Sequence, residues 1–123
     1  MARTTDTLYD STGTAGAAVS TGVLDAKQYD EITVWFIGAG AAAPTGCSVT
    51  PCDVSGTSLP AVSVTVAIAG KSPAVFGAVP ASGVTNAVAL GPVTPKFSAT
   101  GTGGAASTLR ILVLGVLYRT GAN

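Results

Sequence analysis

The sequence contains no histidine, and only 10% of its residues carry a charge. Without histidine, Ser-His-Asp and Cys-His nucleophile pairs are excluded, and so is the commonest protein metal ligand. The two cysteines, Cys47 and Cys52, are too few for a usual zinc site on their own. We therefore expect that the chain is not an enzyme and that it uses neither a cofactor nor a metal.

The two cysteines also bear on disulfide formation. In one continuous strand, Cys47 and Cys52 would point to opposite faces and lie about 17 Å apart, too far for a disulfide. A turn at Thr50-Pro51 would bring them together. We expect two reduced, mostly buried thiols, with a disulfide as the alternative.

The scarcity of charge restricts the partners of the chain. Six basic residues balance six acidic ones, and the basic residues are dispersed along the sequence. Nucleic-acid binding and membrane-surface binding both need clustered Lys and Arg. We therefore expect no nucleic-acid partner and no membrane partner. The apolar run Ile32–Ala43 is too short to span a bilayer, and "MARTTDTLYD" has no apolar core of the kind found in secretory signals.

In contrast to charge, apolar residues are abundant: 47% of the chain is hydrophobic and the mean hydropathy is +0.53. A soluble monomer normally carries a charged surface. Much of this exterior must therefore be small and uncharged, or be covered by another chain. Both alternatives fit the composition, and we favour cover by another chain.

Strand signals dominate the sequence, and no window holds a long apolar period of 3.6 residues. Sixteen glycines and seven prolines interrupt the chain at short intervals. This pattern predicts an all-β fold: a single antiparallel β-sandwich of seven to eight short strands over residues 1–123. The expected strands are Thr5–Tyr9, Ala18–Leu24, Glu31–Ile37, a short strand before a turn at Asp53–Gly56, Ala61–Ile68, one or two within 71–95, and a closing hairpin.

The closing hairpin joins Lys96–Thr100 to a long final strand through a turn at Gly101–Gly104. A similar stretch, "GTAGAAVSTG", occurs near the start of the chain. We interpret this similarity as shared turn composition rather than as a repeat. "GAGAAA", which formally matches a dinucleotide-binding motif, is followed by Pro44 and not by a helix, so it is interpreted as a loop.

The final strand, "LRILVLGVLYR", is apolar on both faces. One face holds residues expected in the core: Leu109, Ile111, Val113 and Leu117. A sheet with one face in water would alternate with polar residues, so the second face also needs cover. That face supplies the first candidate interface residues: Leu112, Leu114, Val116 and Tyr118.

Three stretches together resemble the small β-sandwich decoration, or cement, proteins of tailed bacteriophage heads. They are "TGVLDAKQYDEITVWFIG", "CSVTPCDVSGTSL" and "PKFSATGTGGAASTLRILVLGVLYR". The resemblance implies a jelly-roll-like fold and self-association, as a homotrimer in preference to a dimer. It also implies assembly in the host cytoplasm and contact with the major capsid protein on the virion surface. Residues 1–14 are then a candidate N-terminal arm, which adds Arg3, Leu8 and Tyr9 to the interface candidates.

Two functions follow as hypotheses. The first is a capsid decoration subunit that stabilises the head by binding the major capsid protein. The alternative is a host-adhesion or carbohydrate-binding module of a tail or fibre. That alternative needs an exposed aromatic platform, for which the candidates are Tyr9, Tyr29, Trp35 and Tyr118.

Overall fold

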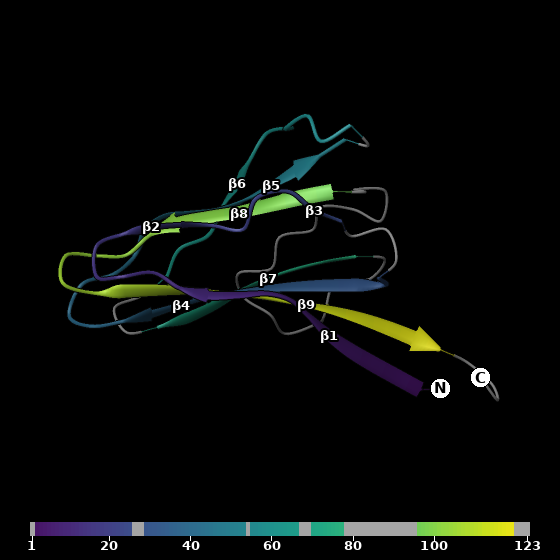
Figure 1. Cartoon of the computed structure of the whole chain (residues 1–123), viewed down its shortest axis with the longest axis horizontal. Coiled ribbons are helices and arrows are strands. Elements are labelled where there is room, and N and C mark those ends of the chain that lie inside the picture. The colour runs from purple at the N-terminus through teal and green to yellow at the C-terminus, as the bar shows by residue number, and fades with distance from the viewer. Residues whose placement is uncertain (1, 26–28, 54, 67–69, 78–95, 120–123) are drawn as a thin grey trace.

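A computed structural model describes residues 2–25, 29–53, 55–66, 70–77 and 96–119. These residues form nine strands, all paired antiparallel, in two sheets that face each other (Figure 1). The all-β sandwich expected from the sequence is confirmed. The strands are β1 (Ala2–Thr12), β2 (Ala18–Ser20), β3 (Leu24–Asp25), β4 (Glu31–Ala39), β5 (Thr45–Cys52), β6 (Val62–Ser63), β7 (Lys71–Gly77), β8 (Lys96–Thr102) and β9 (Thr108–Arg119).

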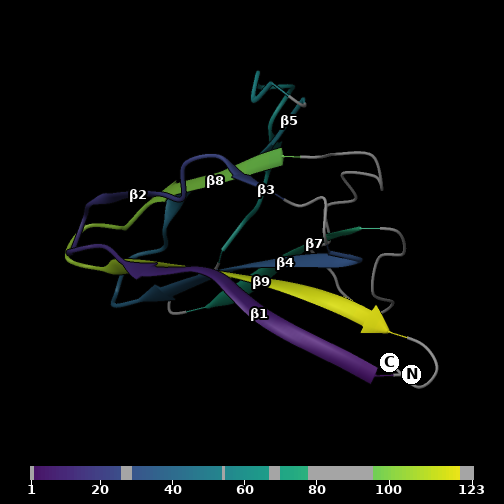
Figure 2. The same ribbon diagram turned by 45° about the vertical axis from the view of Figure 1, so that its right-hand side comes forward.

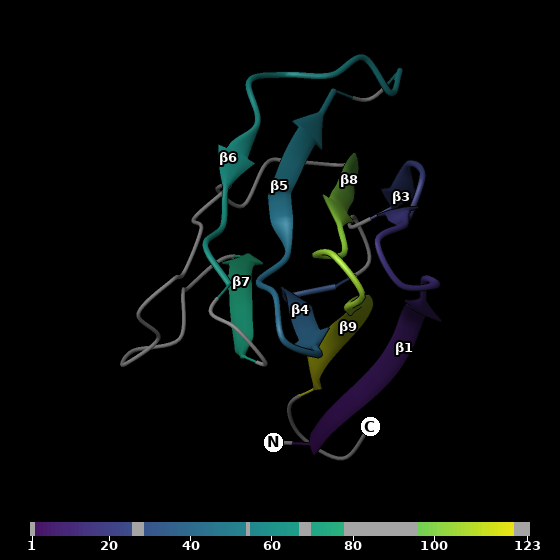
Figure 3. The ribbon, with the colours of Figure 1, turned by 90° about the vertical axis from the view of Figure 1, so that its left-hand side faces the viewer.

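One sheet, called sheet A below, has the strand order β1-β9-β4-β7. The other, sheet B, has the order β2-β8-β5-β6, and β3 also pairs with β8. Figure 2 shows the two layers again, and Figure 3 shows β1 and β7 at opposite edges of sheet A. The ladders β1–β9, β2–β8, β4–β7 and β5–β6 nest inside one another along the sequence, as in one long hairpin folded over on itself.

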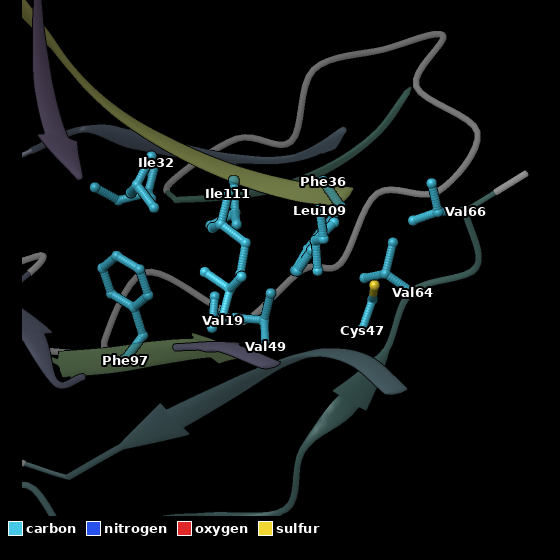
Figure 4. Close-up of a cluster of buried hydrophobic side chains, with 13 residues drawn as sticks. Val19, Ile32, Phe36, Cys47, Val49, Val64, Val66, Phe97, Leu109 and Ile111 are labelled. Carbon is cyan, nitrogen blue, oxygen red and sulfur yellow. The ribbon is translucent and has the colours of Figure 1, made fainter. Parts of the chain in front are cut away.

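The core lies between the sheets and follows from the two-residue period of the strands. In β4, the buried residues Ile32, Val34 and Phe36 alternate with partly exposed ones. Leu109, Ile111 and Val113 of β9 continue this inner face, as the sequence predicted. Figure 4 shows Leu109 and Ile111 opposite Phe97, Val49 and Val19 of sheet B. Each fully buried side chain of this size stabilises the fold by about 1.5–3 kcal/mol.

The closing hairpin predicted for β8 and β9 is wrong. Both strands are present, but β8 belongs to sheet B and β9 to sheet A. Each strand has one strongly apolar face, and both faces must reach the same core. Phe97 and Ala99 of β8 therefore face the core from the opposite side to Ile111. The glycine-rich segment between the two strands crosses from one sheet to the other.

Three such crossings meet at one end of the sandwich: residues 13–17, 40–44 and 103–107. Ser107, which is 1% exposed, joins them. Its carbonyl oxygen accepts from the Gly16 N–H at 2.9 Å, and its Oγ accepts from the Ala42 N–H at 3.0 Å. The Gly103 N–H donates to the Ala17 carbonyl at 2.9 Å. This end of the sandwich is thus held by hydrogen bonds between loops that are distant in sequence.

Other predictions are refined. The strand expected at Ala61–Ile68 is reduced to Val62–Ser63, because beyond it the chain leaves the ladder. Val64 and Val66 are nevertheless buried, and Figure 4 shows them beside Cys47 at one side of the core. Residues 67–69 and 78–95 lie outside the described residues. Both cysteines are free and buried, as expected for reduced thiols, and burial raises the pKa of Cys47.

Candidate interface on the outer face of sheet A

The outer face of sheet A carries an apolar patch at its centre. It consists of Trp35 and Ile37 of β4 together with Leu112 and Leu114 of β9. Trp35 is the register partner of Leu112, and Leu114 pairs with Thr33 on the same face. All four side chains of the patch are partly exposed. The patch therefore keeps apolar surface open to solvent on a sheet whose other face is already used by the core.

An open hollow of about 270 Å³ lies within this patch. Its lining residues are Trp35, Ile37, Leu112 and, from β7, Lys71. Lys71 is the register partner of Ile37 and is exposed. The hollow is therefore apolar at its floor and has a single ammonium group at its rim, a combination suited to an apolar side chain that has an acidic neighbour.

An ion pair lies at the β1 side of the patch. Arg110 Nε donates to Asp10 Oδ1 and Arg110 Nη2 to Asp10 Oδ2, both at 2.7 Å. Arg110 holds the pKa of Asp10 below its ordinary value through this hydrogen bonding and through its charge. Asp10 is the register partner of Leu112 on β9. The two charges neutralise each other beside the patch, so the patch itself is bordered by little net charge.

The outer face of sheet B has a different character. Its outward positions hold small hydroxyl residues, among them Ser48 of β5 and Thr100 of β8, whose hydroxyl oxygens lie 3.4 Å apart. Further outward positions on these strands are Thr50, Ser98 and Thr102. The outward positions of β5 and β8 are therefore mostly hydroxyl-bearing, with Lys96 at the start of β8, and Val62 of β6 is an exposed apolar residue at the edge of this sheet. Because its four apolar side chains lie together on two neighbouring strands, the outer face of sheet A is the candidate interface.

The structure separates the four candidates from the final strand. Leu112 and Leu114 lie on the outer face and are partly exposed, as the alternation predicted. Val116 is different: only 7% of it is exposed, so it offers little contact surface. Leu117, expected in the core, is partly exposed. The simple alternation thus holds up to Leu114. Beyond Leu114, Tyr29 covers Gly115. From there on, buried and exposed residues no longer alternate, since Gly115 and Val116 are both buried.

The N-terminal candidates lie in β1, which pairs with β9 along residues 2–12. Leu8 and Tyr9 are half-buried and pack against the core, and the Tyr9 hydroxyl donates to the Ser20 carbonyl at 3.2 Å. These two residues therefore contribute to the packing of the sandwich itself. The segment expected as an arm is an edge strand of sheet A. Arg3 and Tyr118 are register partners in the same ladder, and their side chains lie outside the described set.

Of the candidate interface residues on β4 and β7, Ile37 and Lys71 were not predicted, and Trp35 was predicted only as part of an aromatic platform for the alternative function. The alternation of "EITVWFIG" does place Thr33, Trp35 and Ile37 together on one face, so a signal for β4 was present. What the sequence does not reveal is that β4 and β9 are neighbours in one sheet, which joins Trp35 to Leu112. Lys71 comes from a third strand and carries no motif.

The described residues contain no group of three or more His, Cys, Asp or Glu side chains placed to hold a metal ion. Within the same residues, no helix is long and apolar enough to cross a membrane. Comparisons of the chain with protein-family models, with curated proteins and with solved structures give no match.

Proposed function

We propose that the chain is a structural virion protein, a capsid decoration subunit that self-associates and stabilises the head by binding the major capsid protein. The observation that carries this proposal is the apolar patch on the outer face of sheet A. Burial of Trp35, Ile37, Leu112 and Leu114 against another chain would remove apolar area from water. On a symmetric shell, many copies of a modest contact add up through avidity.

The topology supports the same proposal. The nested ladders, with β1-β9-β4-β7 facing β2-β8-β5-β6, favour the jelly-roll-like arrangement that the resemblance implies. Jelly rolls serve in viral capsid domains and in lectins, so this support rests on analogy of fold. The proposed location is the capsid surface, with assembly in the host cytoplasm. The oligomer that the resemblance implies is a homotrimer in preference to a dimer.

Sedimentation tests this function. A lysate of cells that make the protein in its natural context is separated on a sucrose gradient, and the protein is followed with an antibody. We expect it in the fast-sedimenting, capsid-sized fractions, together with the major capsid protein. Its presence only at the top of the gradient, in a lysate that contains assembled particles, would contradict the proposal.

A second function is favoured by one specific observation, the place of Trp35 in the open hollow of sheet A. A partly exposed indole offers a ring face for stacking on a sugar ring, as in a host-adhesion or carbohydrate-binding module. Acrylamide quenching of Trp35 fluorescence distinguishes the two functions. Strong quenching in the assembled protein, reversed by an added glycan, favours adhesion. Protection of Trp35 on assembly favours decoration.

A further inference from the structure

We infer that the apolar patch of sheet A pairs face to face with the same patch of a second copy of this chain, about a twofold axis that runs across the strands. This inference rests on the self-association proposed above and names its surface and geometry, which are those of a dimer and not of the homotrimer that the resemblance implies. A twofold contact uses one self-complementary surface on both copies. The flat outer face of a sheet can meet another sheet in this way, as sheets do inside sandwiches.

Charge at the two ends of the patch sets the direction of the axis. Glu31 begins β4 and lies on the outer face, because its neighbour Ile32 is buried inward. Lys71 lies at the other end, beside Ile37, about 20 Å from Glu31 along an extended strand. Neither side chain has an ion-pair partner among the residues that the structure describes. The outer face of sheet A therefore has a carboxylate at one end of the patch and an ammonium group at the other.

An axis across the strands reverses the strand direction of the second copy. Glu31 of each copy then lies over Ile37 of the other, within reach of the neighbouring Lys71, which makes two equivalent ion pairs. An axis parallel to the strands would instead bring the two Glu31 side chains toward each other and leave both lysines without partners. Charge complementarity thus selects the first axis.

The shape of the patch agrees with this axis. Reversal of the strands places Leu114 of the second copy above Leu112 and Trp35, the floor of the hollow. Glu31 of the same second copy then supplies the acidic group beside Lys71 at the rim of the hollow. Arg110 does not oppose the contact, because Asp10 already neutralises it. One twofold operation therefore fills both hollows and pairs both lysines.

The area of the outer face of sheet A sets an upper limit on the contact. The whole face, four strands about 4.8 Å apart and about seven residues long, covers at most about 440 Å² per copy, or about 900 Å² in total. This area is below the standard size of specific interfaces and in the range of weak, transient contacts. We therefore expect a reversible dimer with a micromolar dissociation constant, which a capsid lattice would strengthen through avidity.

The test is a charge-swap series on the full chain, measured by sedimentation velocity over a concentration series. Glu31→Lys and Lys71→Glu should each weaken dimerisation about tenfold, because two exposed attractions become repulsions. The double variant E31K/K71E should restore the affinity of the unmodified chain. Leu114→Asp should abolish dimerisation, and Ser98→Asp, on the outer face of sheet B, should leave it unchanged. Circular dichroism and thermal melting verify that each variant folds.

Several outcomes would overturn the inference: an unmodified chain that stays monomeric up to millimolar concentration, an oligomer of threefold mass, or a double swap that is no stronger than the single swaps. The sucrose gradient distinguishes this failure from failure of the proposed function. Dimerisation as described, without entry into capsid-sized particles, would contradict the proposed function and support the dimer. Entry into the particles by a chain that is monomeric in solution would contradict the dimer and support the function.

Discussion

The ring of Tyr29 lies so close to Gly115 that a Cβ atom at that position would come within 2.6 Å of Tyr29 Cδ1. The Tyr29 hydroxyl donates to Asp6 Oδ2 at 3.1 Å, and Asp6 is the register partner of Gly115 on β1. The ring thus takes the space that a side chain on β9 would fill. Glycine at this position lets Tyr29 reach across β9 to the edge strand.

Gly115→Ala is therefore expected to lower the free energy of unfolding by about 1–3 kcal/mol, the usual cost of overpacking. Urea denaturation followed by fluorescence measures it. The control is the same change in a Tyr29→Ala background, where the added methyl meets no ring and should cost much less. Equal costs in both backgrounds would show that the ring does not determine the need for glycine.

Ser107 supplies a second prediction. Its Oγ accepts the hydrogen bond from the Ala42 N–H at 3.0 Å in a buried position. Ser107→Ala leaves this N–H without its partner, so the free energy of unfolding should fall by about 1–3 kcal/mol. The matched control is Ser63→Ala on β6, where the residue is exposed and the change should cost less than about 0.5 kcal/mol. If the Ser107→Ala variant is as stable as the Ser63→Ala control, the hydrogen bond from Ala42 to Ser107 does not stabilise this end of the sandwich.

Ala106 has a φ of 54°, in the left-handed region where a Cβ atom is unfavourable. Ala106→Gly should raise the free energy of unfolding by up to about 1 kcal/mol, since relief of strain outweighs the added freedom of the unfolded chain. Ala105→Gly, one residue earlier and also exposed, has no such strain to relieve and should lower stability slightly. Thermal denaturation of both variants compares the two signs directly.

The Asp10–Arg110 pair predicts a pH dependence. The pair lowers the pKa of Asp10 from its ordinary value of 3.8, so its stabilisation is fully present above that value. As the pH falls through the lower folded-state pKa, Asp10 is protonated and the stabilisation is lost. The stability difference between the unmodified chain and Asp10→Asn should therefore shrink below pH 3.8. High salt should shrink it at neutral pH as well.

The control for this pair is the double variant D10N/R110Q. If the two side chains act on each other, the double variant should be about as stable as either single variant. Additive losses would mean that each side chain acts through other contacts.

The sequence was sufficient to predict the strands whose alternation is strong. The strand at Glu31–Ile37 and the buried side of the final strand were both predicted, because the two-residue period determines which side chains point inward. The hairpin failed because a glycine-rich segment looks the same whether it joins neighbours in one sheet or crosses to another. The strand at Ala61–Ile68 failed in part, because Val64 and Val66 reach the core without a full ladder.

Only the part of the candidate interface that lies on the final strand could be predicted from alternation. Leu112 and Leu114 follow from their own strand. Trp35 and Lys71 join them only through the order β9-β4-β7, which depends on contacts between residues far apart in sequence. Val116 shows the opposite error, since the alternation placed it on an open face and local packing buries it.

The crossings at the Ser107 end have a consequence for how the chain folds. Since the chain crosses repeatedly between the two sheets, nearly every ladder joins distant parts of the sequence, and β1 pairs with β9. Folds dominated by such pairings form slowly, because loop closure must precede any gain in contacts. During synthesis, sheet A lacks β9, the strand between β1 and β4, until residues 108–119 leave the ribosome. The apolar inner face of β4 is exposed during that interval, so we expect newly made chains to depend on a low local concentration or on a chaperone until β9 inserts between β1 and β4.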